Sequence, residues 1–187
     1  HSSDLILNGE TLTLVSVAVD GLPLDESRYT LGDDLLTIRG IDRECDVIVV
    51  NRFSPSANKA LSGIYTSGQN LMSQCEAQGF RRITYFLDRP DVLSRYSVVI
   101  RASKEQYPVL LSNGNRIEEK DLDDGRHEAR WEDPFPKPCY LFALVAGRLE
   151  ALRTEPLPGT RALLLTSNGR SMERIGALAR VTAILEE

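Results

Sequence analysis

Two polar side chains flank a cysteine in the middle of the chain, in the segment Gln74-Cys75-Glu76. A carboxylate forms strong charge-assisted hydrogen bonds with cations, and a primary amide can both donate and accept hydrogen bonds. In an extended segment, residues two apart share one face of a sheet, and a solvated edge is the usual explanation for such a pair. The pair alone therefore indicates a polar surface, and other residues must decide whether that surface binds a ligand.

Zinc peptidase chemistry needs two histidines one helical turn apart, with a glutamate beside the first as general base. The chain has only two histidines, His1 and His127. Glu128 follows His127, but Trp131 stands where the second ligand belongs, and the surrounding pattern is that of a strand. A hydrolase of the serine type is not indicated either, because no G-x-S-x-G segment occurs. We therefore predict no catalytic residue and no metal site within this chain.

The composition excludes several classes of partner. A net charge of −5 over 187 residues offers no basic patch of the kind that nucleic acid requires. No apolar run approaches the length needed to cross a bilayer. The three cysteines, Cys45, Cys75 and Cys139, are widely spaced, which argues against a disulfide framework and favours a reducing compartment. We expect neither nucleic acid nor a membrane as partner, and interpret each cysteine as a small buried hydrophobe.

Most of the chain has the pattern of short strands separated by turns, which predicts a mainly β fold, an antiparallel sandwich or saddle. The clearest example is the hairpin expected around Gly32-Asp33-Asp34. We expect the segment Asp133 to Pro138 to be a stiff, extended connection, because proline fixes φ and restricts the residue before it. The expected strands are residues 11–19, 28–31, 35–39, 45–53, 96–102, 109–112, 127–132 and 140–146.

The last stretch of the chain has a different pattern. Prolines and a glycine in residues 155–159 predict a boundary, and Arg161 to Thr166 predicts a further strand. From Ser171, a plausible N-cap, apolar residues recur at helical spacing and predict a C-terminal helix. We therefore predict a β-domain at residues 1–155 and the truncated start of a second domain at residues 156–187.

Four blocks of sequence carry a resemblance to a known family. They are Gly63-Ile64-Tyr65, the segment Q-C-E-A-Q-G-F-R at 74–81, D-R-P-D at 88–91 and Y-L-F-A-L-V-A-G at 140–147. In this order and spacing, the chain resembles the aminopeptidase N family, the alanyl aminopeptidases among the zinc metallopeptidases, from about Leu5 to Gly147. The resemblance implies the N-terminal β-domain of an enzyme that removes N-terminal amino acids from peptides. It also implies that the first strands of that domain are missing here.

The resemblance assigns roles to individual residues. In this family the β-domain packs over a catalytic domain and lends a glutamine and a glutamate to substrate binding, and by motif these are Gln74 and Glu76. Glu76 is expected to pair with the free α-ammonium group of a peptide substrate. The resemblance also implies zinc in the intact enzyme, with ligands beyond Glu187 and none bound by this chain alone. The implied partners are the substrate's N-terminus and the missing catalytic domain. The reducing compartment that the cysteines favour is expected to be the cytoplasm.

Two other interpretations stay open: a stand-alone β-sandwich module that binds peptides or proteins, and an inactive pseudoenzyme. Two further sets of residues are interpreted as structural. Charged residues around Pro90 are expected to fix a loop by capping and ion pairing; they are Arg81, Arg82, Asp88, Arg89 and Asp91. Four aromatic residues are expected in the core because aromatic side chains dominate buried area; they are Trp131, Phe135, Tyr140 and Phe142.

Overall fold

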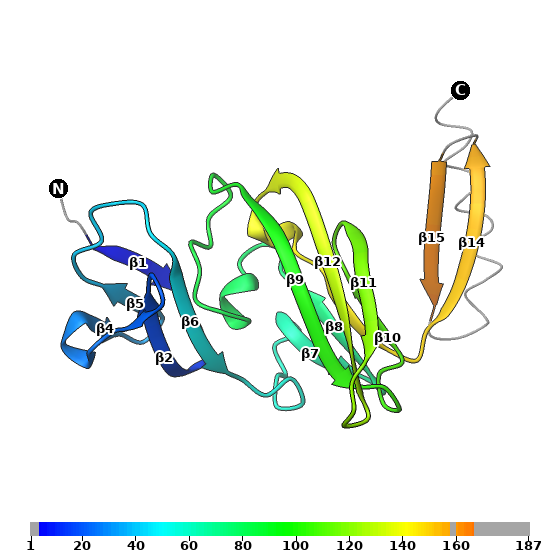
Figure 1. The fold of residues 1–187 in the computed structure, drawn as a ribbon, viewed down its shortest axis with the longest axis horizontal. Coiled ribbons are helices and arrows are strands. Elements are labelled where there is room, and N and C mark those ends of the chain that lie inside the picture. The colour runs from blue at the N-terminus through cyan, green and yellow to red at the C-terminus, as the bar shows by residue number, and fades with distance from the viewer. Residues whose placement is uncertain (1–3, 158–159, 167–187) are drawn as a thin grey trace.

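Short antiparallel strands make up most of the computed structural model, which describes residues 4–157 and 160–166 (Figure 1). The strands are β1 (Leu5–Asn8), β2 (Thr13–Val19), β3 (Leu22–Pro23), β4 (Tyr29–Leu31), β5 (Leu35–Ile38), β6 (Val47–Arg52), β7 (Gly63–Ser67), β8 (Asn70–Gln74), β9 (Ser94–Ser103), β10 (Val109–Ser112), β11 (Asn115–Asp121), β12 (Arg126–Lys137), β13 (Leu144–Gly147), β14 (Glu150–Leu157) and β15 (Thr160–Thr166). The 3-10 helices are η1 (Glu26–Arg28), η2 (Phe80–Arg82) and η3 (Cys139–Leu141). The prediction of a mainly β fold is confirmed.

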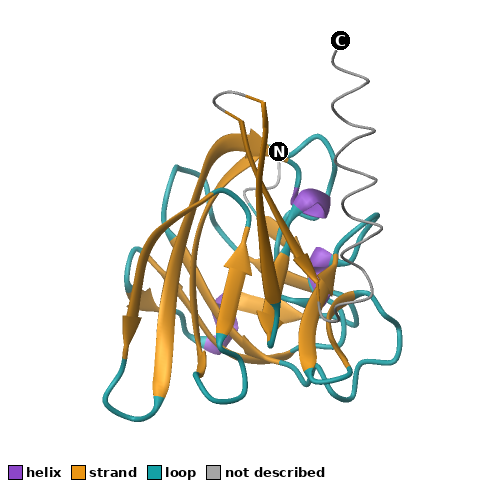
Figure 2. Ribbon diagram, turned by 90° about the vertical axis from the view of Figure 1, so that its right-hand side faces the viewer, coloured by secondary structure: helices purple, strands orange, loops and turns teal. Residues whose placement is uncertain are grey.

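Five sheets form from these strands. Two three-stranded sheets, β1-β5-β4 and β3-β2-β6, lie at one end of the long axis in Figure 1. A four-stranded sheet, β10-β13-β8-β7, and a three-stranded sheet, β11-β12-β9, follow, and β14 pairs with β15. The expected hairpin is confirmed as β4 and β5, where Leu31 pairs with Leu36. Figure 2 shows how little helix interrupts the strands.

The first core lies where the two N-terminal sheets face each other. Its buried side chains are Leu7, Val17, Leu36, Ile38 and Tyr85. Strand β6 alternates half-buried and exposed positions along its whole length, as expected for a strand with one face on a core. Burial of these apolar side chains contributes roughly 1.5–3 kcal/mol each, which favours packing of the two sheets against each other.

The second and third cores position the middle of the chain. The buried side chains of the second core are Cys75, Phe80, Cys139 and Phe142. The Phe80 ring meets two others edge to face, with its centroid 5.0 Å from that of Phe86 and 5.1 Å from that of Phe142. Such aromatic pairs add about 0.5–1.5 kcal/mol beyond burial. The third core joins the two middle sheets through Leu110, Ala129 and Ala146. The loop after β8 is therefore held in place by the second core, which contains Cys75.

Three expectations about local structure were wrong. The segment expected as a strand at 140–146 begins instead with η3, and β13 starts only at Leu144, because Asn113 bonds both the Leu141 carbonyl and the Ala143 N–H and holds the chain in a turn. The segment Asp133 to Pro138 is extended, as expected, but as far as Lys137 it is part of β12 rather than a connection. Phe135, expected in the core, is 73% exposed, since the pairing of β12 with β9 shifts register between Asp133 and Lys137.

The C-terminal part of the chain is described only as far as Thr166. The expected strand there is present as β15, and the helix expected from Ser171 lies outside the described residues. The ladder between β14 and β15 spans the predicted domain boundary at residue 155, and the division into two domains stays a prediction. Among the described residues, no helix is long and apolar enough to cross a membrane.

Candidate functional site

Gln74 and Glu76 lie together at the end of the β7–β8 hairpin. Gln74 is the last residue of β8 and pairs with Gly63 of β7. Glu76 lies two residues beyond the end of the strand, in a turn, and both side chains are exposed. The Gln74 side-chain Nε2 donates to the backbone carbonyl of Glu76 at 3.4 Å. The two side chains therefore share one polar surface because of a turn rather than because they alternate along a strand.

Cys75 anchors that surface. Its side chain is 2% exposed and packs with Phe80, Cys139 and Phe142. Burial raises the pKa of the Cys75 thiol to about 12, with a further contribution from the nearby Asp88 carboxylate. The thiol is thus protonated at neutral pH, which fits the interpretation of a small buried hydrophobe. With the central residue of the segment buried, its two neighbours point outward.

Two glycines make the turn possible. Gly63 has φ +78, a backbone conformation that residues with a side chain rarely adopt. A Cβ at this position would lie 2.7 Å from the Cβ of Arg82. A Cβ at Gly79 would lie 2.4 Å from the Gln74 carbonyl oxygen and 2.8 Å from the Ser62 Oγ. The Gly79 N–H donates to the Cys75 carbonyl at 2.7 Å. Side chains at either glycine would push η2 away from the hairpin that carries Gln74.

Gly79→Ala should therefore destabilise the fold, by about 2 kcal/mol as in other overpacked sites. The matched control is Gly68→Ala, because Gly68 also lies in a turn of this hairpin, with φ +60 but open space around it; its cost should be about 1 kcal/mol of backbone strain. Urea unfolding of the two variants compares the effects. If Gly79→Ala were no less stable than Gly68→Ala, the close approach of η2 would not matter.

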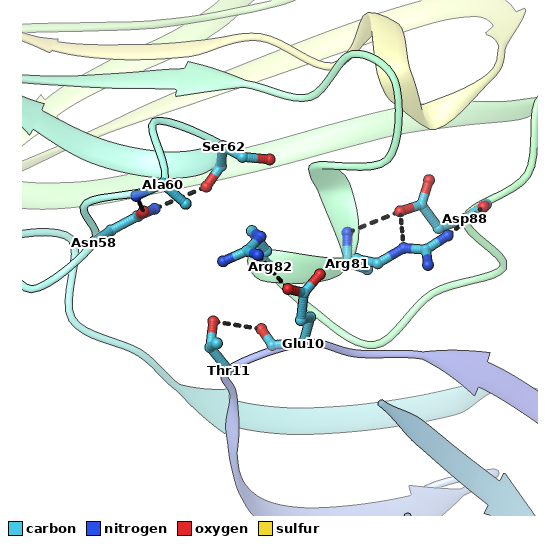
Figure 3. Close-up of polar contacts among 8 residues, drawn as sticks. All are labelled: Glu10, Thr11, Asn58, Ala60, Ser62, Arg81, Arg82 and Asp88. Atoms are coloured by element: carbon cyan, nitrogen blue, oxygen red, sulfur yellow. Dashed lines mark hydrogen bonds and ion pairs between the residues drawn. The ribbon is translucent and has the colours of Figure 1, made fainter. Parts of the chain in front are cut away.

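A buried carboxylate fixes the other side of the turn. Asp88, 2% exposed, accepts hydrogen bonds from the Arg81 N–H at 3.2 Å and from the Arg81 Nε at 2.8 Å (Figure 3). Its second oxygen accepts from the Cys139 thiol at 3.0 Å. Burial, and then this hydrogen bond, raise the pKa of the Cys139 thiol to about 12. Asp88 thus joins η2, which follows the Gln74-Glu76 turn, to the start of η3.

The remaining charged residues of the Pro90 region divide into two kinds. Arg89 pairs with Asp91 at 2.9 Å, and both side chains are well exposed. Arg82 instead reaches Glu10, and the Glu10 N–H donates to the Arg81 carbonyl at 2.8 Å. The interpretation of this cluster as loop-fixing is confirmed by these contacts. The role of Glu10 was missed, because nothing in the sequence links residues 72 positions apart.

His127 is a structural residue. It lies in β12, is 1% exposed, and its Nε2 lies 2.7 Å from the Tyr107 carbonyl oxygen. Across the part of the chain that the structure describes, no three His, Cys, Asp or Glu side chains are grouped so as to hold a metal ion. The described residues therefore do not form a zinc site.

The described residues thus form an antiparallel β-domain that presents a glutamine and a glutamate on one anchored turn. Comparison with known proteins identifies its kind: the chain belongs to the Peptidase M1 N-terminal domain family, whose model matches residues 1–141. The chain is 52% identical over 149 residues to aminopeptidase N of Escherichia coli (strain K12). That match covers 80% of this chain and 17% of the relative.

Solved structures agree with this assignment. Legionella pneumophila aminopeptidase A, in complex with aspartic acid, has a TM-score of 0.82 and 39% identity, over 88% of this chain and 20% of that one. An M1 zinc metallopeptidase variant from Deinococcus radiodurans, bound to a Tyr-ser-ala substrate, has a TM-score of 0.73 over 90% of this chain and 40% of that one. At 14% identity the latter shows the fold alone. The chain thus spans well under half the length of each of these relatives.

Proposed function

We propose that this chain is the N-terminal β-domain of a zinc aminopeptidase and that it recognises the free N-terminus of peptide substrates. Glu76 pairs with the substrate's α-ammonium group, and Gln74 supplies an acceptor and donors to the same end of the peptide. The observation that carries the proposal is the anchored turn: Gln74 and Glu76 are exposed side by side, while Cys75 between them is buried.

The physical reason lies in what an exopeptidase must distinguish. A free chain end carries a positive charge, whereas an internal amide does not. A carboxylate that loses part of its hydration when substrate binds discriminates between the two, because charge-assisted hydrogen bonds are strong and an unpaired buried charge is costly. A glutamine adds directional hydrogen bonds but no net charge. Glu76 is therefore the better candidate for reading the charge, and Gln74 for orienting the amine.

The remaining parts of the proposal concern the whole protein. Residues 1–155 form the β-domain, residues 156–187 begin a catalytic domain, and zinc is bound by that domain outside the described residues. The relatives named above are peptidases much longer than this chain, which supports a catalytic domain as partner. All three cysteines are free, which supports a reducing compartment, the cytoplasm.

Hydrolysis of alanyl-p-nitroanilide tests the proposal. The natural protein that carries this sequence should cleave it, should lose the activity when a chelator removes zinc, and should regain it when zinc is returned. The 187-residue chain alone should neither cleave the substrate nor bind zinc stoichiometrically. Absence of activity in the zinc-loaded natural protein would instead support a peptide-binding module or a pseudoenzyme.

A further inference from the structure

A second candidate site lies away from Gln74 and Glu76, between the open end of the β2–β6 ladder and the loop at residues 53–60. It is a cavity of about 440 Å³. Three cationic side chains line it: Arg52 from the end of β6, Lys59 from the loop and Arg82 from η2. No carboxylate belongs to its lining among the described residues. In a chain with a net charge of −5, such a cluster makes a local positive field.

Much of the hydrogen-bonding capacity of these cations is unused. The Arg52 side chain is exposed and has no hydrogen bond or ion pair among the described residues. Lys59 donates once, to the Ser56 carbonyl at 3.3 Å, which leaves two of its three donors. Arg82 gives a terminal nitrogen to Glu10, and its guanidinium has further donors. Figure 3 shows Arg82 between the loop that carries Asn58 and the turn that carries Thr11.

Hydroxyl groups lie among the cations. Thr13 is directly opposite Arg52 in the β2–β6 ladder, so their side chains are neighbours on one face. Ser54 lines the same cavity. Arginine, lysine and hydroxyl donors together suit a ligand with several anionic oxygens, since a guanidinium matches phosphate geometry with two parallel bonds.

The backbone around the cavity is held in unusual conformations. Thr11, which lines the cavity, has φ +57, and Leu61, just beyond Ala60 of the lining, has φ +53. Residues other than glycine rarely adopt a positive φ, and β-branched residues do so least of all. The turn at Thr11 is held against η2, because the neighbouring Glu10 bonds both Arg81 and Arg82. Residues with such strained backbone conformations cluster at ligand-binding and active sites.

From these observations we propose that the cavity lined by Arg52, Lys59 and Arg82 is a binding site for a phosphate group. The apolar part of its lining, Phe53, Ala57 and Ala60, leaves room beside the anion for an organic substituent. The ligand class is therefore a small phosphate, either inorganic or a phosphate monoester. The site shares no lining residue with the Gln74-Glu76 turn, and its failure would leave the proposed function unchanged.

Isothermal titration calorimetry of the natural protein with inorganic phosphate tests the site, at an ionic strength held constant with sodium chloride. We expect saturable binding at one site, weakened at least about tenfold by Arg52→Gln and also weakened by Lys59→Gln. The matched control is Arg95→Gln, which removes the same charge from an exposed strand position of β9 outside the cavity and should leave the affinity unchanged. Tighter binding of phenyl phosphate than of phosphate would identify a monoester ligand, and equal binding the inorganic ion.

Two results would overturn the proposal. One is heat that never saturates in the unmodified protein. The other is an equal loss of affinity in Arg52→Gln and Arg95→Gln, which would reduce the effect to general charge screening. Circular dichroism of each variant checks that the fold is intact, and because Arg52 and Lys59 are exposed and have few protein contacts, neither substitution should disturb it.

Discussion

Glu76→Gln in the natural protein is expected to lower kcat/KM for alanyl-p-nitroanilide by roughly 10- to 100-fold. Hydrogen bonds to charged groups are worth about 1.5–3 kcal/mol, and each 1.4 kcal/mol is a factor of ten. The glutamine keeps the shape of the side chain but cannot neutralise an ammonium group. Because the Glu76 side chain is exposed in a turn and has no ion pair among the described residues, thermal stability should hardly change.

The control for this experiment is Glu44→Gln, which removes one exposed carboxylate far along the chain from the turn. Steady-state kinetics should separate the two variants clearly. An unchanged kcat/KM in Glu76→Gln would remove Glu76 from the substrate site. A loss of similar size in both variants would point to net charge as the cause, because long-range fields act on any charged substrate.

Several strands that the sequence predicted correctly have an apolar face on a core. Strand β10 was placed at its observed bounds, and β4 with β5 formed the expected hairpin. Strand β11 was missed because all seven of its residues are exposed, so it has no alternating apolar signal. It exists because β12 offers a ladder to pair with, and pairing partners distant in sequence cannot be found from local periodicity.

The candidate site was located by its motif, but its geometry was not. The types and spacing of Gln74 and Glu76 suggested a strand face, whereas the structure places Glu76 beyond the end of β8. The turn depends on Gly63 and Gly79 approaching η2, and on Asp88 bonding Arg81 and Cys139. These are tertiary contacts between segments far apart in sequence. Residue type indicates that such groups have partners, but only the fold shows which ones.

Phe135 illustrates the opposite error. A large aromatic side chain was expected in the core, and it lies 73% exposed. The prolines on either side of it cannot donate to a ladder, and the β9–β12 register shifts there. The local backbone thus overrides the preference of the side chain for burial.

Asp88→Asn is expected to have the largest effect on stability, about 3 kcal/mol. Removing one partner of a buried ion pair leaves the other charge uncompensated, which typically costs 3–5 kcal/mol. Here Arg81 is 18% exposed and Asp88 only 2%, so little water can replace the lost charge. Asparagine can still accept from the Arg81 N–H, which places the expected loss at the lower end. For a domain of this size, the melting temperature should fall by roughly 6–12 °C.

Asp91→Asn is the matched control, because Asp91 lies three residues away and also pairs with an arginine. The Arg89–Asp91 pair is 61% and 68% exposed, and exposed pairs contribute about 0–1 kcal/mol. Thermal unfolding followed by far-ultraviolet circular dichroism compares the two variants. Equal melting temperatures would mean that the Asp88 carboxylate is not what holds η2 against η3. A selective loss in Asp88→Asn, with a raised KM below the melting temperature, would show that this carboxylate also keeps the Gln74-Glu76 turn in position.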